Sequence, residues 1–164
     1  DLALGILAPE HRGIRSELLF NERYMAVTSL NWKPLSGRVG KTLTLEQLRQ
    51  SGFAVASPTA TFHGSVEKML TRMKLEDRIV LRSRHFSAMP DIARQTDLIA
   101  IIPEMYVRAL QLRQDLRIWD ITDAPVYEVR MVWHKSTDND SRHIWMRRLV
   151  CSLFQRQVKA PTKS

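Results

Sequence analysis

Cysteine is nearly absent from this sequence, because Cys151 is the only one in 164 residues. A disulfide framework needs paired cysteines and a thiolate metal site needs closely spaced ones, so both are excluded. No apolar run approaches the roughly 18 residues of a membrane-spanning helix, and the first residues lack the basic-then-apolar order of a secretory signal. The sequence therefore predicts a soluble, cytoplasmic protein that neither spans nor binds a membrane.

Enzyme motifs are missing as well. The sequence has no Gly-x-Ser-x-Gly nucleophile elbow, no phosphate-binding P-loop and no paired-carboxylate arrangement. Cys151 falls in the middle of a predicted helix near its apolar side, where an inert buried thiol is expected. We therefore expect no catalytic residue, no metal ligand and no cofactor, and we do not interpret the protein as an enzyme.

Charged residues are plentiful but evenly spread. Lys and Arg number 25 against 17 Asp and Glu, which gives a net charge of +8 and a pI near 10.1. That balance is typical of many nucleic-acid-binding proteins, yet the basic residues never form a run of five or six and no RRM, KH, zinc-finger or basic-zipper pattern accompanies them. A solvated basic surface that favours small anionic ligands is the better interpretation, with direct nucleic-acid binding as the weaker one.

Strand-like and helix-like segments alternate through the middle of the chain. The strand-like segments "FAVAS", "RIVLRS" and "DLIAIIP" are separated by helix-like ones, which predicts right-handed crossovers, a parallel sheet and an α/β fold. Upstream, Thr44 stands three residues before Gln47, a capping-box signal, and the same helix is expected to end at Gly52.

Two longer elements flank this region. Apolar residues at even spacing predict a long strand that includes Leu18 and Ala26. Near the other end, "DSRHIWMRRLVCSLFQ", residues 140–155, has the pattern of an amphipathic helix. Its inward face is predicted to carry Met146, Leu149, Val150 and Leu153, and its outward face Arg142, Arg147, Arg148 and Arg156.

Three loops follow the central strands, "SPTATFHG", "RHFSA" and "IIPE". Ligands of open α/β sheets bind beyond the carboxyl ends of the strands, and the helix N-termini that follow offer free N–H groups to a carboxylate or phenolate. His85 would then be an orienting donor, and Phe86 or Phe62 a stacking surface. Structural alternatives stay open, since His85 could tie its loop to a backbone carbonyl, His63 could face solvent and Pro103 could serve only as a helix start.

Several segments in a fixed order resemble one protein family. The segments "DLALG", "ERYMAV", "TLEQL", "HFSAMPDIARQTDLIAIIPEMY" and "VWHKSTDNDSRHIWMRRLV" are similar to the effector-binding domain of LysR-type transcriptional regulators. The resemblance is strongest to members that sense aromatic acids or nitroaromatics and to nodulation regulators. It covers residues 1 to about 155.

The resemblance implies a fold like the type II periplasmic-binding proteins, with two Rossmann-like lobes joined by two crossover strands. The crossovers would be Glu22–Leu30 and Tyr127–His134. Residues 1–29 and 127–164 would form lobe I, discontinuous and incomplete, and residues 30–126 would form lobe II. The resemblance also implies that the family's N-terminal helix-turn-helix domain would lie outside this chain.

The resemblance also implies regulation by binding. A small effector, an aromatic or other organic anion, would bind between the lobes, and the full-length protein would form a homodimer or tetramer that contacts DNA only through its N-terminal domain. The implied effector site comprises Gly5, Ile6, Thr59, Thr61, Phe62, His63, His85, Phe86, Ser87, Ile102 and Pro103. The alternative is a periplasmic-type solute-binding protein of a transporter, which shares the lobe architecture.

Overall fold

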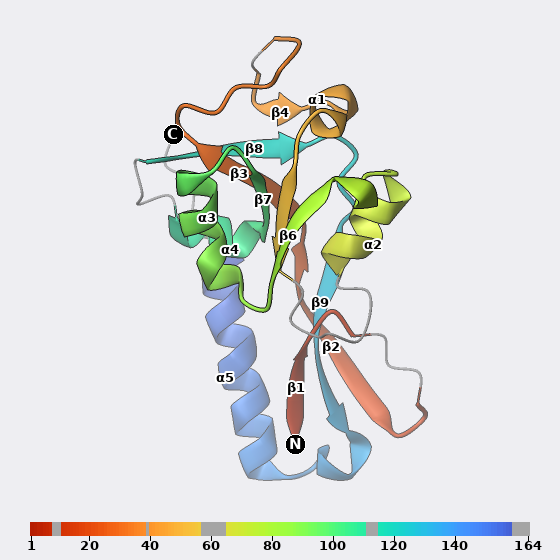
Figure 1. Cartoon of the computed structure of the whole chain (residues 1–164). Helices are drawn as coiled ribbons and strands as arrows, with labels where there is room; N and C mark the ends of the chain where they lie inside the picture. The colour runs from red at the N-terminus through yellow and green to blue at the C-terminus, as the bar shows by residue number, and fades with distance from the viewer. Residues whose placement is uncertain (8–10, 39, 57–64, 111–114, 159–164) are drawn as a thin grey trace. The chain divides into compact units, whose positions relative to one another are not determined.

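A computed structural model of the chain describes residues 1–7, 11–38, 40–56, 65–110 and 115–158. The chain divides into two compact units (Figure 1): unit 1 consists of Asp1–Glu22 with Val126–Ser164, and unit 2 consists of Arg23–Pro125. Each unit is described by itself below.

Unit 2 is built on a mixed six-stranded sheet. The strands in spatial order are β4 (Thr42–Leu43), β8 (Leu116–Ile121), β3 (Tyr24–Ser29), β7 (Ile99–Pro103), β5 (Phe53–Ala56) and β6 (Ile79–Ser83). β5, β6 and β7 are parallel, as the alternation of strands and helices predicts. β3 runs antiparallel to both β7 and β8, so the sheet is not purely parallel.

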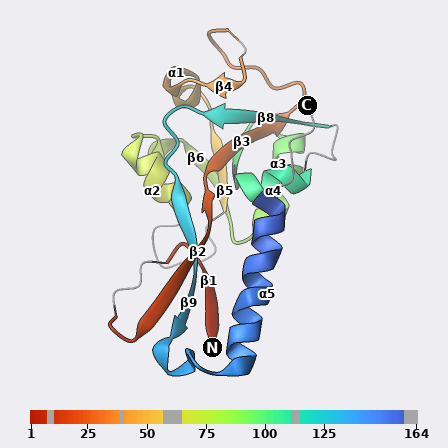
Figure 2. The ribbon, with the colours of Figure 1, turned by 180° about the vertical axis from the view of Figure 1, so that it is seen from behind.

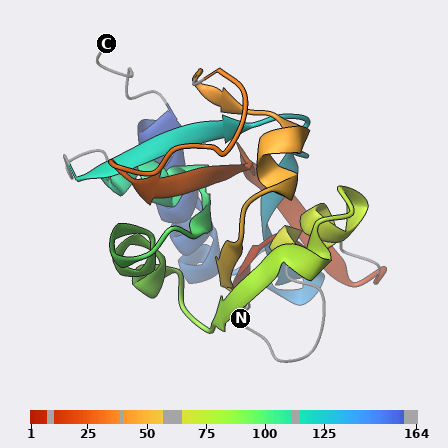
Figure 3. The ribbon, with the colours of Figure 1, turned by 45° about the horizontal axis from the view of Figure 1, so that its top comes forward.

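Helices cover both faces of this sheet (Figure 3). They are α1 (Leu45–Arg49), α2 (Ser65–Arg72), α3 (Met89–Gln95) and α4 (Glu104–Leu110), with short 3-10 turns η1 (Glu76–Arg78) and η2 (Phe86–Ala88). Ala100 and Ile102 of β7 share a core cluster with Met89 of α3, while Ile99 and Ile101 alternate with them and are equally inaccessible. The central strand is therefore apolar on both faces because both are covered.

The predicted capping box at the start of α1 is confirmed. The Thr44 hydroxyl accepts from the Gln47 N–H, and the Gln47 side chain accepts from the Thr44 N–H at 3.0 Å. The predicted C-cap at Gly52 is wrong, because α1 ends at Arg49 and Gln50 caps it. A Cβ at Gly52 would instead lie 2.9 Å from side-chain atoms of Leu98 and Val80, so a larger residue there would force these side chains to shift.

Unit 1 is a three-stranded antiparallel sheet with one long helix (Figure 2). Its strands in spatial order are β1 (Leu2–Gly5), β9 (Tyr127–His134) and β2 (Ile14–Glu22), followed by η3 (Lys135–Thr137) and α5 (Ser141–Val158). Phe154 of α5 stacks on Phe20 of β2 with ring centroids 5.2 Å apart. No helix in the described part of the chain is long and apolar enough to cross a membrane.

The predicted orientation of α5 is wrong in part, since Arg142 and Arg148 are exposed as predicted and Val150 is partly buried, but the other predicted inward residues are not. Met146, Leu149 and Leu153 are exposed, whereas the predicted outward residue Arg147 is half-buried, with its guanidinium 4.6 Å from the centre of the Trp133 ring. Arg147 also donates to the carbonyls of Thr137 and Asp138. A long cationic side chain can lie against an aromatic ring and satisfy backbone carbonyls at the same time, so charge alone does not indicate an outward position.

The predicted crossover strand Glu22–Leu30 is interrupted. β2 ends at Glu22, which pairs with Tyr127 in unit 1, and β3 begins at Tyr24, which pairs with Pro103 in unit 2. Arg23 stands between the two strands, so the chain changes sheets within one residue.

Candidate functional site

The carboxyl ends of β5, β6 and β7 lie at one edge of the unit 2 sheet. β5 pairs in parallel with β6 and with β7, in a register that sets Ala56 opposite Ser83. Parallel neighbours end at the same edge, so the loops after these strands start side by side. The predicted residues of the loop after β5, Thr59, Thr61, Phe62 and His63, lie outside the described residues.

At the end of β6, a serine holds the turn that presents His85. The Ser83 hydroxyl accepts from the His85 N–H at 3.2 Å and lies 3.4 Å from the His85 carbonyl oxygen, to which it donates. The His85 side chain is exposed and has no hydrogen-bond partner within the described ranges. The imidazole is thus left available. Sequence reasoning missed Ser83, although a hydroxyl residue two positions before a turn is a known signal.

The residues after His85 divide between surface and core. Ser87 is exposed, whereas Phe86 is partly buried and packs against the core cluster that contains Met89 and Ile102. Ile102 itself is 0% exposed. Its side chain therefore belongs to the core and supports Phe86, while Pro103, the last residue of β7, is partly accessible.

The end of β7 differs from the end of β6 because it carries an ionic cluster. The Glu104 N–H donates to the Arg23 carbonyl at 2.8 Å, and the Glu104 carboxylate accepts from Arg23 Nε at 2.9 Å and from Arg108 Nη2 at 3.2 Å. Arg23 Nη2 also lies 3.1 Å from Asp120 Oδ1. The first amide of α4 is therefore occupied, and a carboxylate stands beside it.

Two opposing influences act on the pKa of Glu104. Partial burial would raise it, but the hydrogen bonds and charges of Arg23 and Arg108 together lower the pKa below its ordinary value of 4.5. Glu104 is therefore ionised at neutral pH, and its charge is paired with those of Arg23 and Arg108.

The two remaining predicted residues, Gly5 and Ile6, belong to unit 1. Gly5 is the last residue of β1 and pairs with Arg130 of β9. Ile6 follows it, and its side chain is exposed. Both lie at the carboxyl end of β1.

Unit 1 contains a hollow of about 430 Å³ between α5 and the sheet. It is lined by Glu17, Trp133, Ile144, Arg147, Arg148, Cys151 and Ser152. The Cys151 thiol donates to Glu17 Oε1 at 3.3 Å, and burial together with this carboxylate raises the pKa of the thiol to about 11. The thiol therefore stays protonated at neutral pH and is a poor nucleophile. Within the described residues, no group of three or more His, Cys, Asp or Glu side chains could hold a metal ion.

Comparison with known proteins identifies relatives over almost the whole chain. The family model described as the LysR substrate binding domain matches residues 1–153. The chain is 28% identical over 158 residues to the HTH-type transcriptional activator NahR of Pseudomonas putida, covering 94% of this chain and 50% of that protein. It is 26% identical over 155 residues to the HTH-type transcriptional activator NagR of Ralstonia sp, with the same coverage of 94% and 50%.

A solved structure of a transcriptional regulator is also similar to this chain. The probable transcriptional regulator PA0477 from Pseudomonas aeruginosa matches with a TM-score of 0.73 at 25% identity, covering 92% of this chain and 48% of that chain. The chain spans about half the length of the curated relatives it matches.

Proposed function

Because the chain belongs to the LysR substrate-binding domain family, we propose that it is the ligand-sensing domain of a transcriptional regulator and that its effector is a small organic anion with an aromatic ring. Units 1 and 2 would be the two lobes that close on this effector. The relatives are named as HTH-type transcriptional activators, so a helix-turn-helix domain on the longer protein would contact DNA. We place the protein in the cytoplasm, as a homodimer or tetramer without enzymatic activity.

The end of β6 carries this proposal. Ser83 fixes the turn and leaves the His85 imidazole exposed and without a partner in the described chain, next to the ring of Phe86, which rests on the core. An imidazole N–H can donate to a carboxylate, and an adjacent aromatic ring can stack on a planar ligand. Ser87 adds an exposed hydroxyl two residues after His85.

No covalent step is needed for this function. An effector that binds one arrangement of the two lobes better than another shifts the equilibrium between them, and only by the difference between its two affinities. Coupling of this kind is about 1–3 kcal/mol in regulatory proteins. His85 would orient the anion, Phe86 would stack on its ring, and Gly5 and Ile6 would contact it from unit 1. Thr59, Thr61, Phe62 and His63 would complete the site from the loop after β5.

The test is a thermal-shift titration of the 164-residue chain with salicylate, benzoate and nitrobenzoate. A ligand that binds only the folded protein at about 100 times its Kd adds about 2.7 kcal/mol, which raises the melting temperature of a protein of this size by several degrees. We expect at least one of the anions to do so, and His85→Ala to abolish the shift.

His11→Ala is the matched control, because His11 is an exposed histidine of unit 1, and it should leave the shift intact. A shift that survives His85→Ala would contradict the proposed site, and the absence of a shift with every anion would contradict the proposed ligand class. A transporter solute-binding protein is not favoured, since the matched family model and the relatives are those of regulators.

A further inference from the structure

The hollow between α5 and the sheet of unit 1 has the size of a small-molecule site. Its volume of about 430 Å³ falls in the range of about 300–1,000 Å³ that is usual for ligand pockets. Glu17 of β2 and Trp133 of β9 form its sheet side. Glu17 pairs with Met131, and Trp133 lies two residues further along the same strand, so all three point to one face of the sheet. The hollow thus belongs wholly to unit 1, unlike the end of β6.

One of the charged groups that line the hollow is already engaged. Arg147 donates to the carbonyls of Thr137 and Asp138, and its guanidinium lies over the Trp133 ring. These contacts hold its side chain against unit 1, so it has little left to offer a ligand. The complete lining from α5 is Ile144, Arg147, Arg148, Cys151 and Ser152.

The two charged groups that remain have opposite signs. Glu17 accepts from the Cys151 thiol through Oε1 at 3.3 Å, while its Oε2 accepts no hydrogen bond from a described residue. Arg148 precedes Cys151 by three residues, so the two are neighbours on the helix surface. Within the described ranges, neither Glu17 nor Arg148 takes part in an ion pair. An unpaired acid and an unpaired base therefore stand beside the same thiol.

We propose that this hollow binds a free α-amino acid with an apolar side chain, at a second site separate from the effector site at the end of β6. The ammonium and carboxylate groups of an α-amino acid are attached to one carbon, so they would reach Glu17 and Arg148 together. The apolar side chain would contact Ile144 and Trp133. A ligand with only one of these charges would leave the opposite group of the hollow without a partner, which lowers affinity.

The test is calorimetric titration of the 164-residue chain with L-phenylalanine and L-leucine. Phenylpropionate, which lacks the ammonium group, and phenethylamine, which lacks the carboxylate, are the matched compounds. We expect L-phenylalanine to bind about tenfold more tightly than either, because each analogue loses one charge-assisted hydrogen bond. Absence of binding by both amino acids, or equal binding of the three aromatic compounds, would overturn the proposal.

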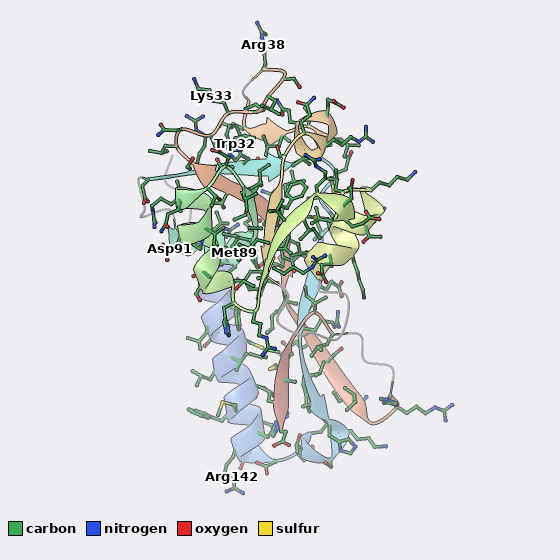
Figure 4. All side chains as sticks on the ribbon, in the orientation of Figure 1. Trp32, Lys33, Arg38, Met89, Asp91 and Arg142 are labelled. Carbon is green, nitrogen blue, oxygen red and sulfur yellow. The ribbon has the colours of Figure 1, made fainter. Side chains whose placement is uncertain are left out.

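Two substitutions assign the charges of the ligand to the lining residues. Glu17→Gln should remove only the preference over phenylpropionate, and Arg148→Gln only the preference over phenethylamine. Arg142→Gln is the control, because Arg142 stands at the N-terminal end of α5 (Figure 4) and does not line this hollow. Circular dichroism verifies that each variant keeps its fold. Equal losses for Arg142→Gln and Arg148→Gln would contradict a specific contact.

Cys151 reports on the hollow directly, because it is the only cysteine of the chain and lies in the lining. Saturating L-phenylalanine should slow the reaction of the thiol with dithiodipyridine severalfold. Binding that leaves this rate unchanged would place the amino acid elsewhere and overturn the proposal. His85→Ala should not affect the protection, so a failure of this site can be told from a failure of the effector site at the end of β6.

Discussion

Units 1 and 2 bury their apolar residues to very different extents. Among the described residues, Leu19 and Met131 are the buried apolar residues of unit 1, and all the others belong to unit 2. The exposed large apolar residues show the reverse distribution, since only Leu30, Leu35 and Val80 lie in unit 2. The same chain thus contains one well-filled core and one thin one.

The number of layers explains this difference. Unit 2 covers both faces of its sheet with helices, so consecutive residues of β7 are all inaccessible. Unit 1 has one helix on one face of three strands. Leu18 pairs with Arg130, so these two side chains point to the same face of the sheet as each other, and Leu18 remains exposed. A sheet needs cover on both faces to bury both sets of alternating side chains, and the described part of unit 1 lacks the second.

The sharpest test of this comparison is a matched pair of truncations. Phe53→Ala in unit 2 removes a ring that is 0% exposed and should lower the free energy of unfolding by about 3–5 kcal/mol. Leu153→Ala in unit 1 removes a side chain that is half exposed and should cost less than about 0.5 kcal/mol. Urea unfolding is followed by tryptophan fluorescence, with Trp32 and Trp119 reporting on unit 2 and Trp133 and Trp145 on unit 1. Similar losses for the two variants would break the comparison.

A second test asks whether unit 1 depends on polar contacts where unit 2 depends on apolar ones. Arg147→Ala deletes two hydrogen bonds to carbonyls, a contact with His143 and the cover over Trp133, and should destabilise unit 1 by about 1–2 kcal/mol. Arg148→Ala, one residue further on and exposed, should be near neutral. Fluorescence of Trp133 in a Trp145→Phe background measures both effects. Equal effects of the two arginines would contradict an anchoring role for Arg147.

The third test concerns how the folding stability of unit 2 depends on pH through Glu104, the first residue of α4. The pKa of Glu104 is lowered in the folded chain, so the ionised carboxylate stabilises the folded state. This contribution is complete above the ordinary pKa of 4.5 and is lost as the pH falls through the lowered pKa of the folded state. At pH 7, Glu104→Gln should cost at most about 1 kcal/mol, because the partners are partly exposed. Urea midpoints measured from pH 6 to 3 should converge for the two proteins at the acid end. The exposed Glu76 supplies a control, and a convergence after Glu76→Gln as well would remove the special role of Glu104.

The smallest expected effect is on reactivity rather than stability. The pKa of the Cys151 thiol is raised to about 11, so alkylation by iodoacetamide should be slow at pH 7 and should accelerate with a midpoint near pH 11. Glu17→Gln removes the carboxylate that accepts from the thiol and should move the midpoint downward. The urea-unfolded chain provides the reference rate. A midpoint near 9 in the folded protein would show that the thiol is more open to water than the geometry indicates.

Local signals in the sequence were sufficient for much of unit 2. The alternation of strands and helices predicted the parallel neighbours β5, β6 and β7, and Thr44 with Gln47 predicted the start of α1. These features depend on residues a few positions apart, so they can be predicted without knowing which distant residues pack against them. The exposed His85 also follows from its place after a strand, although its role as a ligand contact stays a prediction.

Features that depend on distant partners could not be predicted in this way. Arg23 stands between two strands and forms ion pairs with Glu104 and Asp120, and no local pattern shows that pairing. The charge of Arg147 predicts a position in solvent, whereas Trp133 of β9 provides a surface for its guanidinium group. α5 has apolar residues on both sides, so its periodicity alone does not decide which side faces the sheet.

The strand order of unit 1 has a consequence for synthesis on the ribosome. β9 lies between β1 and β2, although more than a hundred residues separate it from either strand in the chain. Unit 2, by contrast, is one continuous stretch, Arg23–Pro125. A chain emerges from the ribosome N-terminus first, and domains fold as units. Unit 2 can therefore fold before β9, the strand that pairs with both β1 and β2, has been synthesised. Until that strand arrives, the first 22 residues form a nascent segment that a chaperone could bind.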